Sequence, residues 1–285
     1  MKQDLQYFKR VKDFWKRVAH KTVTLFGKST DKFAPSLPAD SNVFYFTDIH
    51  GDLNTYNFII NWCLEQDPNC QIIFGGDAAD RDVHGYTIMK SLLNMPNVIY
   101  LKGNHEQLFV RGARAMLQLS KLEAYKHAKD LLEYFSINAD VLLCLRNGGW
   151  STLLDWWEQE PDNTKEIFIQ QIESLPLVYT YKQYDFCHAG GLPSYFQKII
   201  SANYLADTEW HVLWDRTCLE KPWIDNRICV HGHTPQPSDP AVFNGRLDMD
   251  MGLSNTHRIA VLNATTNIIY VFSTTNYKVV KSYSI

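Results

Sequence analysis

Side chains that can bind a metal ion follow three apolar runs in the first half of the chain. Asp48 and His50 follow residues 43–46, Asp77 follows residues 71–74, and Asn104 and His105 follow residues 98–101. A helical pattern comes after each group, so the rhythm is strand, loop, helix. Ligands bind beyond the carboxyl ends of strands in open α/β sheets, and we therefore expect these side chains to converge.

Two further groups follow apolar runs in the second half. His188 comes directly after Cys187, and the run His231-Gly232-His233-Thr234 comes after Val230. Any one of these groups alone is explained by a turn or by a histidine bonded in the core. The complete ordered series has no such explanation and indicates a built site.

Carboxylates, imidazoles and one amide oxygen form a ligand set that suits Mn, Fe or Zn. The number of ligands implies two metal ions. Such a pair can share a carboxylate and a hydroxide, generate the nucleophile near neutral pH and stabilise the charge of an in-line displacement. The residues therefore indicate metal-assisted hydrolysis of a phosphate ester or anhydride.

The series resembles the calcineurin-like metallophosphoesterases, and within them the phosphoprotein phosphatase branch. The resemblance covers about residues 42–256, and the segment Asp250-Met251-Gly252 ends it. Its five ordered motifs are Asp48-Ile49-His50-Gly51, Gly76-Asp77-Ala78-Ala79-Asp80-Arg81, Gly103-Asn104-His105-Glu106, His188-Ala189-Gly190 and Gly232-His233-Thr234.

The resemblance implies a role for each motif residue. One metal ion would be held by Asp48 and His50, a second by Asn104, His188 and His233, and Asp77 would bridge the two. His105, oriented by Asp80, would protonate the leaving oxygen. Arg81 and Arg216 would bind the substrate phosphate together with Asn104. A surface salt bridge is the alternative role for Arg216.

Three positions depart from the family pattern. Thr47 stands before Asp48 where glycine is usual, and Asp82 follows Arg81 where protein phosphatases have glycine. His231 is additional, and we interpret it as polar filler rather than as support for a ligand. An acidic Asp82 beside the expected phosphate clamp would alter substrate preference.

The fold implied by these patterns is α/β, a four-layer αββα sandwich with two mixed β-sheets. Strands expected at residues 177–181, 184–187, 227–230, 246–249, 259–262 and 268–272 predict a second sheet packed on the first. The catalytic domain is expected over residues 42–285, with a helical insert at about 107–174. We expect the insert tryptophans, Trp150, Trp156 and Trp157, to pack in the core rather than stack a nucleotide base.

Residues 1–41 form a separate basic segment by their pattern. Residues 4–19 space apolar side chains as a helix does and place Lys and Arg between them. We expect the apolar face to pack on the catalytic domain, with docking to an anionic membrane or a partner protein as the alternative.

Charge and composition exclude several classes of protein. Residues 1–32 carry a net charge of +6, so the rest of the chain carries −9 within a total of −3. The acidic remainder argues against nucleic acid as a partner of the catalytic domain. The six cysteines form no C-x-x-C pair, and no run reaches the ~18 to 20 apolar residues of a bilayer span. A cytoplasmic protein with reduced thiols is expected.

The motif residues favour one reaction over two alternatives. Asp80, Arg81 and Glu106 match the protein phosphatase form of the motifs, and so predict a serine/threonine phosphatase-like monoesterase with two divalent metal ions. Mn is expected, with Fe and Zn as alternatives, and a phosphorylated protein or peptide is the expected substrate. The first alternative is a hydrolase of diadenosine tetraphosphate or another nucleotide. The second is a binding scaffold without catalysis, which the complete ligand set argues against.

Overall fold

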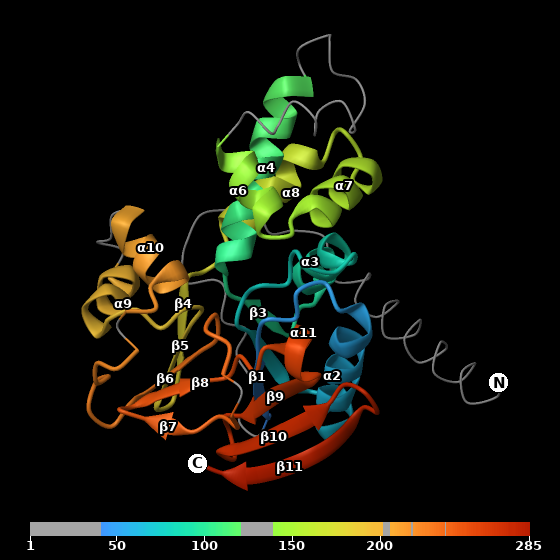
Figure 1. Ribbon diagram of the computed structural model, residues 1–285. Coiled ribbons are helices and arrows are strands. Elements are labelled where there is room, and N and C mark those ends of the chain that lie inside the picture. Colours follow the sequence, from blue (N-terminus) through green and yellow to red (C-terminus); the bar gives the residue numbers. More distant parts are fainter. Residues whose placement is uncertain (1–40, 121–138, 202–205, 218, 237) are drawn as a thin grey trace, which may run out of the picture.

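The computed structural model describes residues 41–120, 139–201, 206–217, 219–236 and 238–285 (Figure 1). The helix expected at residues 4–19 lies outside these ranges. Within them, no helix is both long enough and apolar enough to cross a membrane.

A six-stranded mixed sheet carries the first three ligand groups. Its order is β11-β10-β9-β1-β2-β3. The strands are β1 (Val43–Phe46), β2 (Gln71–Phe74), β3 (Val98–Tyr100), β9 (Arg258–Asn263), β10 (Ile268–Ser273) and β11 (Lys278–Ser284). β1, β2 and β3 pair in parallel, so their carboxyl ends lie at one edge of the sheet. The other neighbours in this sheet pair antiparallel.

A five-stranded mixed sheet carries the other two groups. Its order is β4-β5-β6-β8-β7. The strands are β4 (Val178–Tyr181), β5 (Tyr184–Cys187), β6 (Ile228–His231), β7 (Val242–Phe243) and β8 (Arg246–Asp248). β5 pairs in parallel with β6, which places His188 and the segment after His231 at the same end of neighbouring strands.

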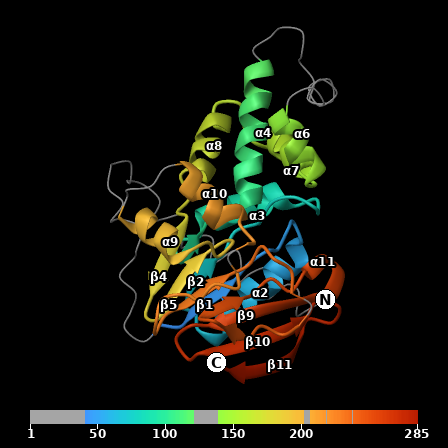
Figure 2. The same cartoon turned by 60° about the vertical axis from the view of Figure 1, so that its left-hand side comes forward.

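Helices cover the outer faces of both sheets or project beyond them. They are α2 (Leu53–Gln66), α3 (Gly85–Asn94), α4 (Asn104–Ser120), α6 (Ala139–Arg146), α7 (Trp150–Gln159), α8 (Lys165–Glu173), α9 (Pro193–Ile200), α10 (Ala206–Trp214) and α11 (Leu253–Thr256). Figures 1 and 2 show α4, α6, α7 and α8 projecting together beyond the sheets, which confirms that the fold contains a helical insert.

The alternation of side chains along β1 explains the layers. Val43 and Tyr45 belong to the core between the two sheets, which also contains residues of β5, β6 and β8. Phe44 and Phe46 point the other way and pack with α2, α3 and the helical insert. This period of two is what a strand buried on both faces requires. The predicted four-layer sandwich is confirmed.

The assignment of later strands to the second sheet was wrong for two of them. β9 and β10 join the first sheet, because β9 pairs antiparallel with β1 through Tyr45 and Leu262. A periodic pattern predicts a strand but not its partner, so sequence could not place them. The short β7 and the edge strand β11 were not expected at all. The described cysteines are buried and form no disulfide.

Candidate metal centre

Asp77 lies at the centre of the converging loops, with one carboxylate oxygen on each side. Its Oδ2 is 3.6 Å from His50 Nε2 and 3.8 Å from His105 Nε2. Its Oδ1 is 3.2 Å from His188 Nε2. The structure thus brings donor atoms from both sheets to a single, 1% exposed carboxylate, as a bridging ligand requires.

Two groups of donors meet at Asp77. One consists of His50, Asp77 and His105, and the other of Asp77, His188 and His233, with donor atoms within 4.8 Å of one another in each group. The Asn104 Oδ1 atom joins the second group, at 2.9 Å from His188 Nε2 and 2.9 Å from His233 Nδ1. The predicted ligands of the second metal ion therefore lie together.

Backbone carbonyls fix which ring nitrogens face the centre. His188 Nδ1 donates to Gly75 O at 2.9 Å, His233 Nε2 to Trp214 O at 3.2 Å, and His50 Nδ1 to Ala79 O at 3.1 Å. Because a carbonyl only accepts, the ring nitrogens that face it carry the hydrogen. The opposite nitrogens of neutral rings then direct lone pairs at carboxylate and amide oxygens. Acceptors that face one another in this way are satisfied by a cation, or by a proton, between them.

The electrostatics of the centre agree with this donor set. Burial lowers the pKa of His50 and of His233 to about 3, which keeps both rings neutral, as metal ligands must be. Burial opposes charge on His188, but Asp77 and Asp48 raise its pKa to about 10. The centre thus attracts positive charge, and a divalent cation would displace this proton. The residues fit two divalent cations.

Asp48 lies beside the first group of donors. Its Oδ1 is 3.9 Å from His50 Nε2, close to the 3.8 Å between His105 Nε2 and Asp77 Oδ2. The carboxylate also accepts from the Thr47 hydroxyl at 2.7 Å and from the His233 backbone N–H at 3.2 Å. Burial and the nearby Asp250 raise its pKa well above the usual range, a penalty that a cation bound beside it would remove.

Several site residues have a backbone conformation that is rare outside glycine. Positive φ values occur at Asp48 (56°), His50 (47°), Asp77 (60°), Asp80 (70°), Arg81 (70°) and His233 (69°). Each such residue costs on the order of 1 to 3 kcal/mol and persists where its surroundings enforce it. Gly232 shows how tight these surroundings are, because a Cβ there would lie 2.0 Å from Asp48 Oδ2.

His105 and Asp80 form the predicted acid pair. His105 Nδ1 donates to Asp80 Oδ2 at 2.8 Å, and both side chains are buried. Burial opposes charge on His105, but Asp77 and Asp80 outweigh it and raise the pKa of the ring above its ordinary value. Nε2 points toward Asp77, so a proton on it faces the centre.

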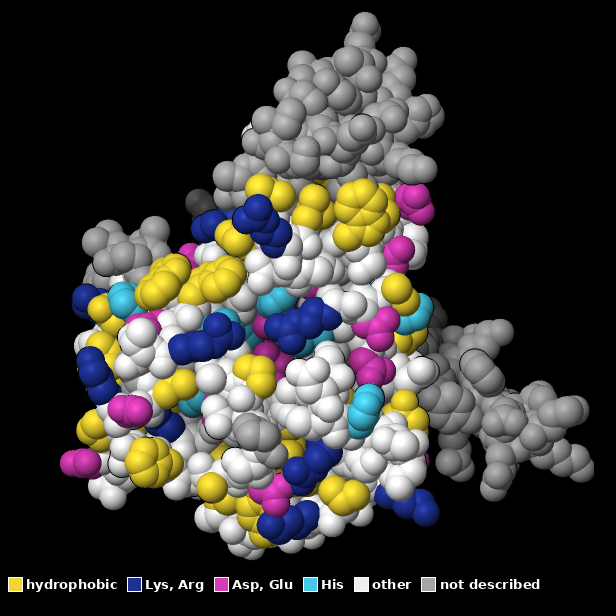
Figure 3. Space-filling view, in the orientation of Figure 1, with side chains coloured by type: hydrophobic (Ala, Val, Ile, Leu, Met, Phe, Trp, Pro, Cys, Tyr) yellow, Lys and Arg dark blue, Asp and Glu magenta, His cyan; other side chains and the backbone are white. Residues whose placement is uncertain are grey.

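The two predicted phosphate-binding arginines are exposed at this face. Arg216 Nη2 donates to the backbone oxygen of His233 at 2.8 Å, which keeps the side chain beside the centre. Arg81 directly follows Asp80 and is also exposed. Figure 3 shows basic side chains gathered around acidic and histidine side chains in the middle of this face, below the helical insert. Asp82 next to Arg81 is exposed as well.

Glu106 has a role that sequence reasoning missed. Its buried carboxylate accepts backbone N–H groups from Asp77 at 2.8 Å, Ala78 at 2.7 Å and Gly103 at 2.8 Å. It also accepts from the Tyr100 hydroxyl at 2.8 Å. Glu106 therefore ties the loop after β2 to the loop after β3 and does not reach a substrate directly. A carboxylate among backbone donors of two loops has no signal in the sequence.

Other predicted residues have different outcomes. Trp156 is fully buried and Trp157 packs against the same core, as expected. Trp150 is 45% exposed, so its expected place in the core was wrong, because it is the first residue of α7 and lies on the open side of that helix. His231 is buried, its Nδ1 contacts Gly232 O at 3.1 Å, and burial lowers its pKa to about 4.

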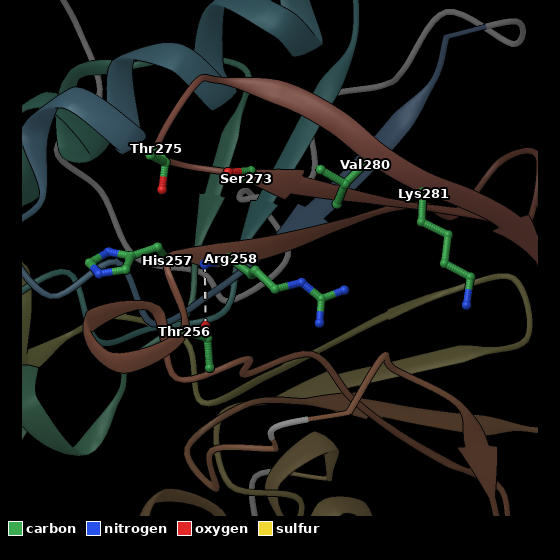
Figure 4. A pocket seen from close by; sticks show the side chains of 7 residues that line it. All are labelled: Thr256, His257, Arg258, Ser273, Thr275, Val280 and Lys281. Atoms are coloured by element: carbon green, nitrogen blue, oxygen red, sulfur yellow. Dashed lines mark hydrogen bonds between the residues drawn. The ribbon is translucent and has the colours of Figure 1, made fainter.

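A separate shallow cleft of about 500 Å³ lies against the carboxyl-terminal strands (Figure 4). Thr256, Arg258 and Lys281 are among its lining residues. Arg258 and Lys281 both pair with Asp239, whose single negative charge offsets one of their two positive charges. None of the predicted site residues lines this cleft.

The family model of the calcineurin-like phosphoesterases matches residues 41–257. No curated protein matches the chain significantly.

Three solved structures are similar to the chain. One is a protein assigned as a diadenosine tetraphosphatase, with 12% identity over 84% of this chain and 91% of that chain and a TM-score of 0.48. Another is a cold-active protein-tyrosine phosphatase of a psychrophilic Shewanella species, with 16% identity, coverage of 90% and 86%, and a TM-score of 0.45. The third is a protein serine/threonine phosphatase from Saccharomyces cerevisiae, with 15% identity, coverage of 81% and 73%, and a TM-score of 0.45. None of these similarities bears on the substrate.

Proposed function

The chain belongs to the calcineurin-like phosphoesterases, and on that premise we propose that it is a phosphomonoesterase of the serine/threonine protein phosphatase type. The position of Asp77 carries the metal-dependent hydrolysis, because its two carboxylate oxygens face histidines from opposite sides, 3.6 Å from His50 and 3.2 Å from His188. The match of Asp80, Arg81 and Glu106 to the protein phosphatase form of the motifs favours the monoesterase. Two divalent cations, when bound, supply an activated water and stabilise the charge on the phosphoryl group. Mn is the proposed metal, since mixed oxygen and nitrogen ligands suit it.

The side chains of the protein have separate tasks in the proposed reaction. Asp48, His50, Asp77, Asn104, His188 and His233 would hold the cations. Arg81 and Arg216 would bind phosphate oxygens with their forked donors and orient the ester for in-line displacement. His105, kept protonated by Asp80, would give its Nε2 proton to the leaving oxygen as the ester bond breaks. These tasks need no contact with the part of the substrate beyond the phosphate.

One observation favours a nucleotide as a second candidate substrate. Trp150 is 45% exposed and begins α7, directly after the Gly148-Gly149 turn that contacts Arg81. An exposed indole near a phosphate clamp can stack a base. Diadenosine tetraphosphate hydrolysis is therefore the candidate to be separated from monoester hydrolysis.

A substrate comparison tests the proposal. Phosphate release from a phosphoserine peptide is measured beside cleavage of diadenosine tetraphosphate, each with Mn²⁺ and with excess chelator. We expect faster turnover of the peptide, which chelator abolishes and Mn²⁺ restores. Preference for diadenosine tetraphosphate would overturn the monoesterase proposal, and activity that survives complete metal removal would overturn the metal requirement.

A further inference from the structure

The helical insert makes hydrogen bonds to the loop that contains Asp80, the proposed partner of His105, and Arg81, a proposed phosphate-binding residue. The Asp80 N–H donates to Thr152 Oγ1 at 2.9 Å, and the Arg81 N–H donates to Gly148 O at 3.2 Å. Ser151 Oγ donates to Asp82 O at 2.9 Å. Three successive residues of the loop thus each make a hydrogen bond to the α6–α7 turn or to the first turn of α7.

This loop needs outside support. Asp80 and Arg81 both have φ of 70°, and two successive non-glycine residues in this region are costly. Burying Asp80 adds a further cost, because its Oδ1 has no hydrogen-bond partner. The loop follows β2 by several residues, and on the sheet side Asp82 is held by its N–H bond to His50 O at 3.2 Å, while Asp80 and Arg81 direct their N–H groups to the insert. The hydrogen bonds from the insert offset these costs.

The fit between the insert and the loop leaves little free space. Thr152 is fully buried. A Cβ added to Gly85 would lie 2.5 Å from Thr152 Oγ1, and one added to Gly149 would lie 3.2 Å from Asp80 Oδ1. Close packing on both sides fixes the Thr152 hydroxyl relative to Asp80. Asp80 in turn holds His105 Nδ1 at 2.8 Å, which makes a continuous chain from α7 to the acid.

We propose that Thr152 is a positioning residue, which acts through Asp80 to aim His105 at the leaving oxygen. The helical insert then contributes to catalysis by fixing the position of Asp80, in addition to lying beside the centre. This inference rests on the proposed function, because it gives His105 a task that only ester cleavage uses. Misplacement of a catalytic group by about 1 Å costs on the order of 10²-fold in rate, so the loss of one support should cost less.

The test uses Thr152→Val, which keeps the shape and removes the hydroxyl, with Thr152→Ser as the matched control. Each protein is assayed with Mn²⁺ on a phosphoserine peptide and on p-nitrophenyl phosphate, together with bound metal and melting temperature. The serine alkoxide is a poor leaving group that needs the acid, whereas p-nitrophenolate leaves as a stable anion. We expect Thr152→Val to lower kcat about tenfold on the peptide and much less on p-nitrophenyl phosphate, with KM and metal content unchanged.

The control and the overturning results are distinct. Thr152→Ser should restore kcat on the peptide, because it restores the hydroxyl. Equal losses on both substrates, or a loss that Ser does not rescue, would overturn the positioning role. If Thr152→Val does not fold, Ser151→Ala replaces it, with a loss of two- to threefold expected on the peptide alone and an unchanged ratio as the overturning result. A wild-type protein inactive on both substrates would overturn the proposed function itself.

Discussion

Different parts of the fold hold the metal-ligand residues of the candidate centre and the residues Asp80 and Arg81. The metal-ligand side stands on strand ends, where Asp77 follows the buried strand β2 and its backbone is fixed by Glu106. The acid and clamp side, Asp80 and Arg81, is held by the α6–α7 turn and α7 of the insert. In the proposed reaction, the sheets thus position the metal ligands, while the insert supports the carboxylate that orients the acid. Mutations should therefore separate metal binding from proton transfer.

Asp77→Asn should give the largest loss of turnover, because it replaces the carboxylate that both donor groups share. Asparagine keeps the shape but offers one neutral oxygen, so both cations should bind weakly. Bound cations would supply several kcal/mol of charge stabilisation, so turnover should fall by about 10³-fold or more. Elemental analysis beside kinetics checks this expectation. Retention of two metal ions per chain with wild-type turnover would contradict a bridging role.

His105→Ala should give a smaller loss of a different kind. The side chain is near Asp77 Oδ2, at 3.8 Å, but a predicted acid should leave the ligand set intact when removed. We expect bound metal to stay as in the wild type and turnover of the peptide to fall about 10²-fold. The loss should be least for p-nitrophenyl phosphate. Loss of metal in this variant would mean that His105 acts as a ligand, as its place in the first donor group allows.

How much the sequence predicts differs between the two supports. The strand-end loops could be placed from sequence, because apolar runs mark the strands and parallel strands bring their carboxyl ends together. The contacts of Thr152 and Glu106 could not, since a hydroxyl in a helix and a carboxylate after a motif look ordinary in sequence. Their partners, Asp80 and Ala78, lie 72 and 28 residues away. Only tertiary packing brings such pairs together.

Tertiary packing also explains why the sequence misplaced β9 and β10 in the second sheet and Trp150 in the core. β9 was expected beside the strands of the second sheet but pairs with β1, whose residue Phe44 lies opposite Asn263. Long-range pairing is decided by which face each strand can bury, and periodicity alone does not choose the partner. Trp150 was expected in the core, yet it is 45% exposed at the first position of α7.

Asp80→Asn should shift the alkaline limb of the kcat/KM pH profile, because Asp80 is the proposed partner of the acid His105. Burial opposes charge on His105, and Asp77 and Asp80 raise its pKa above the ordinary value. The proposed reaction needs the protonated ring, so activity should be present below this pKa and lost as pH rises through it. Without the Asp80 carboxylate the pKa falls, and the alkaline loss of activity should begin at lower pH. Profiles on the peptide with saturating Mn²⁺ check the direction. If activity of the variant were lost at the same pH as in the wild type, or at higher pH, Asp80 would not be the carboxylate that raises the pKa of His105.

Thr47→Val should give the smallest effect and tests the metal side. The Thr47 hydroxyl donates to Asp48 Oδ2 at 2.7 Å, so it orients a predicted ligand. Loss of a group that orients a ligand costs about 10- to 100-fold in metal affinity. The lower end is expected here, because the His233 N–H still holds the carboxylate at 3.2 Å. Titration of the metal-free protein with Mn²⁺ by calorimetry measures the change, with Thr47→Ser as control. Because Thr47 stands on the strand side, the ratio of peptide to p-nitrophenyl phosphate turnover at saturating Mn²⁺ should stay as in the wild type. A changed ratio would mean that the sheet also sets the geometry of the acid, and that the two supports are not independent.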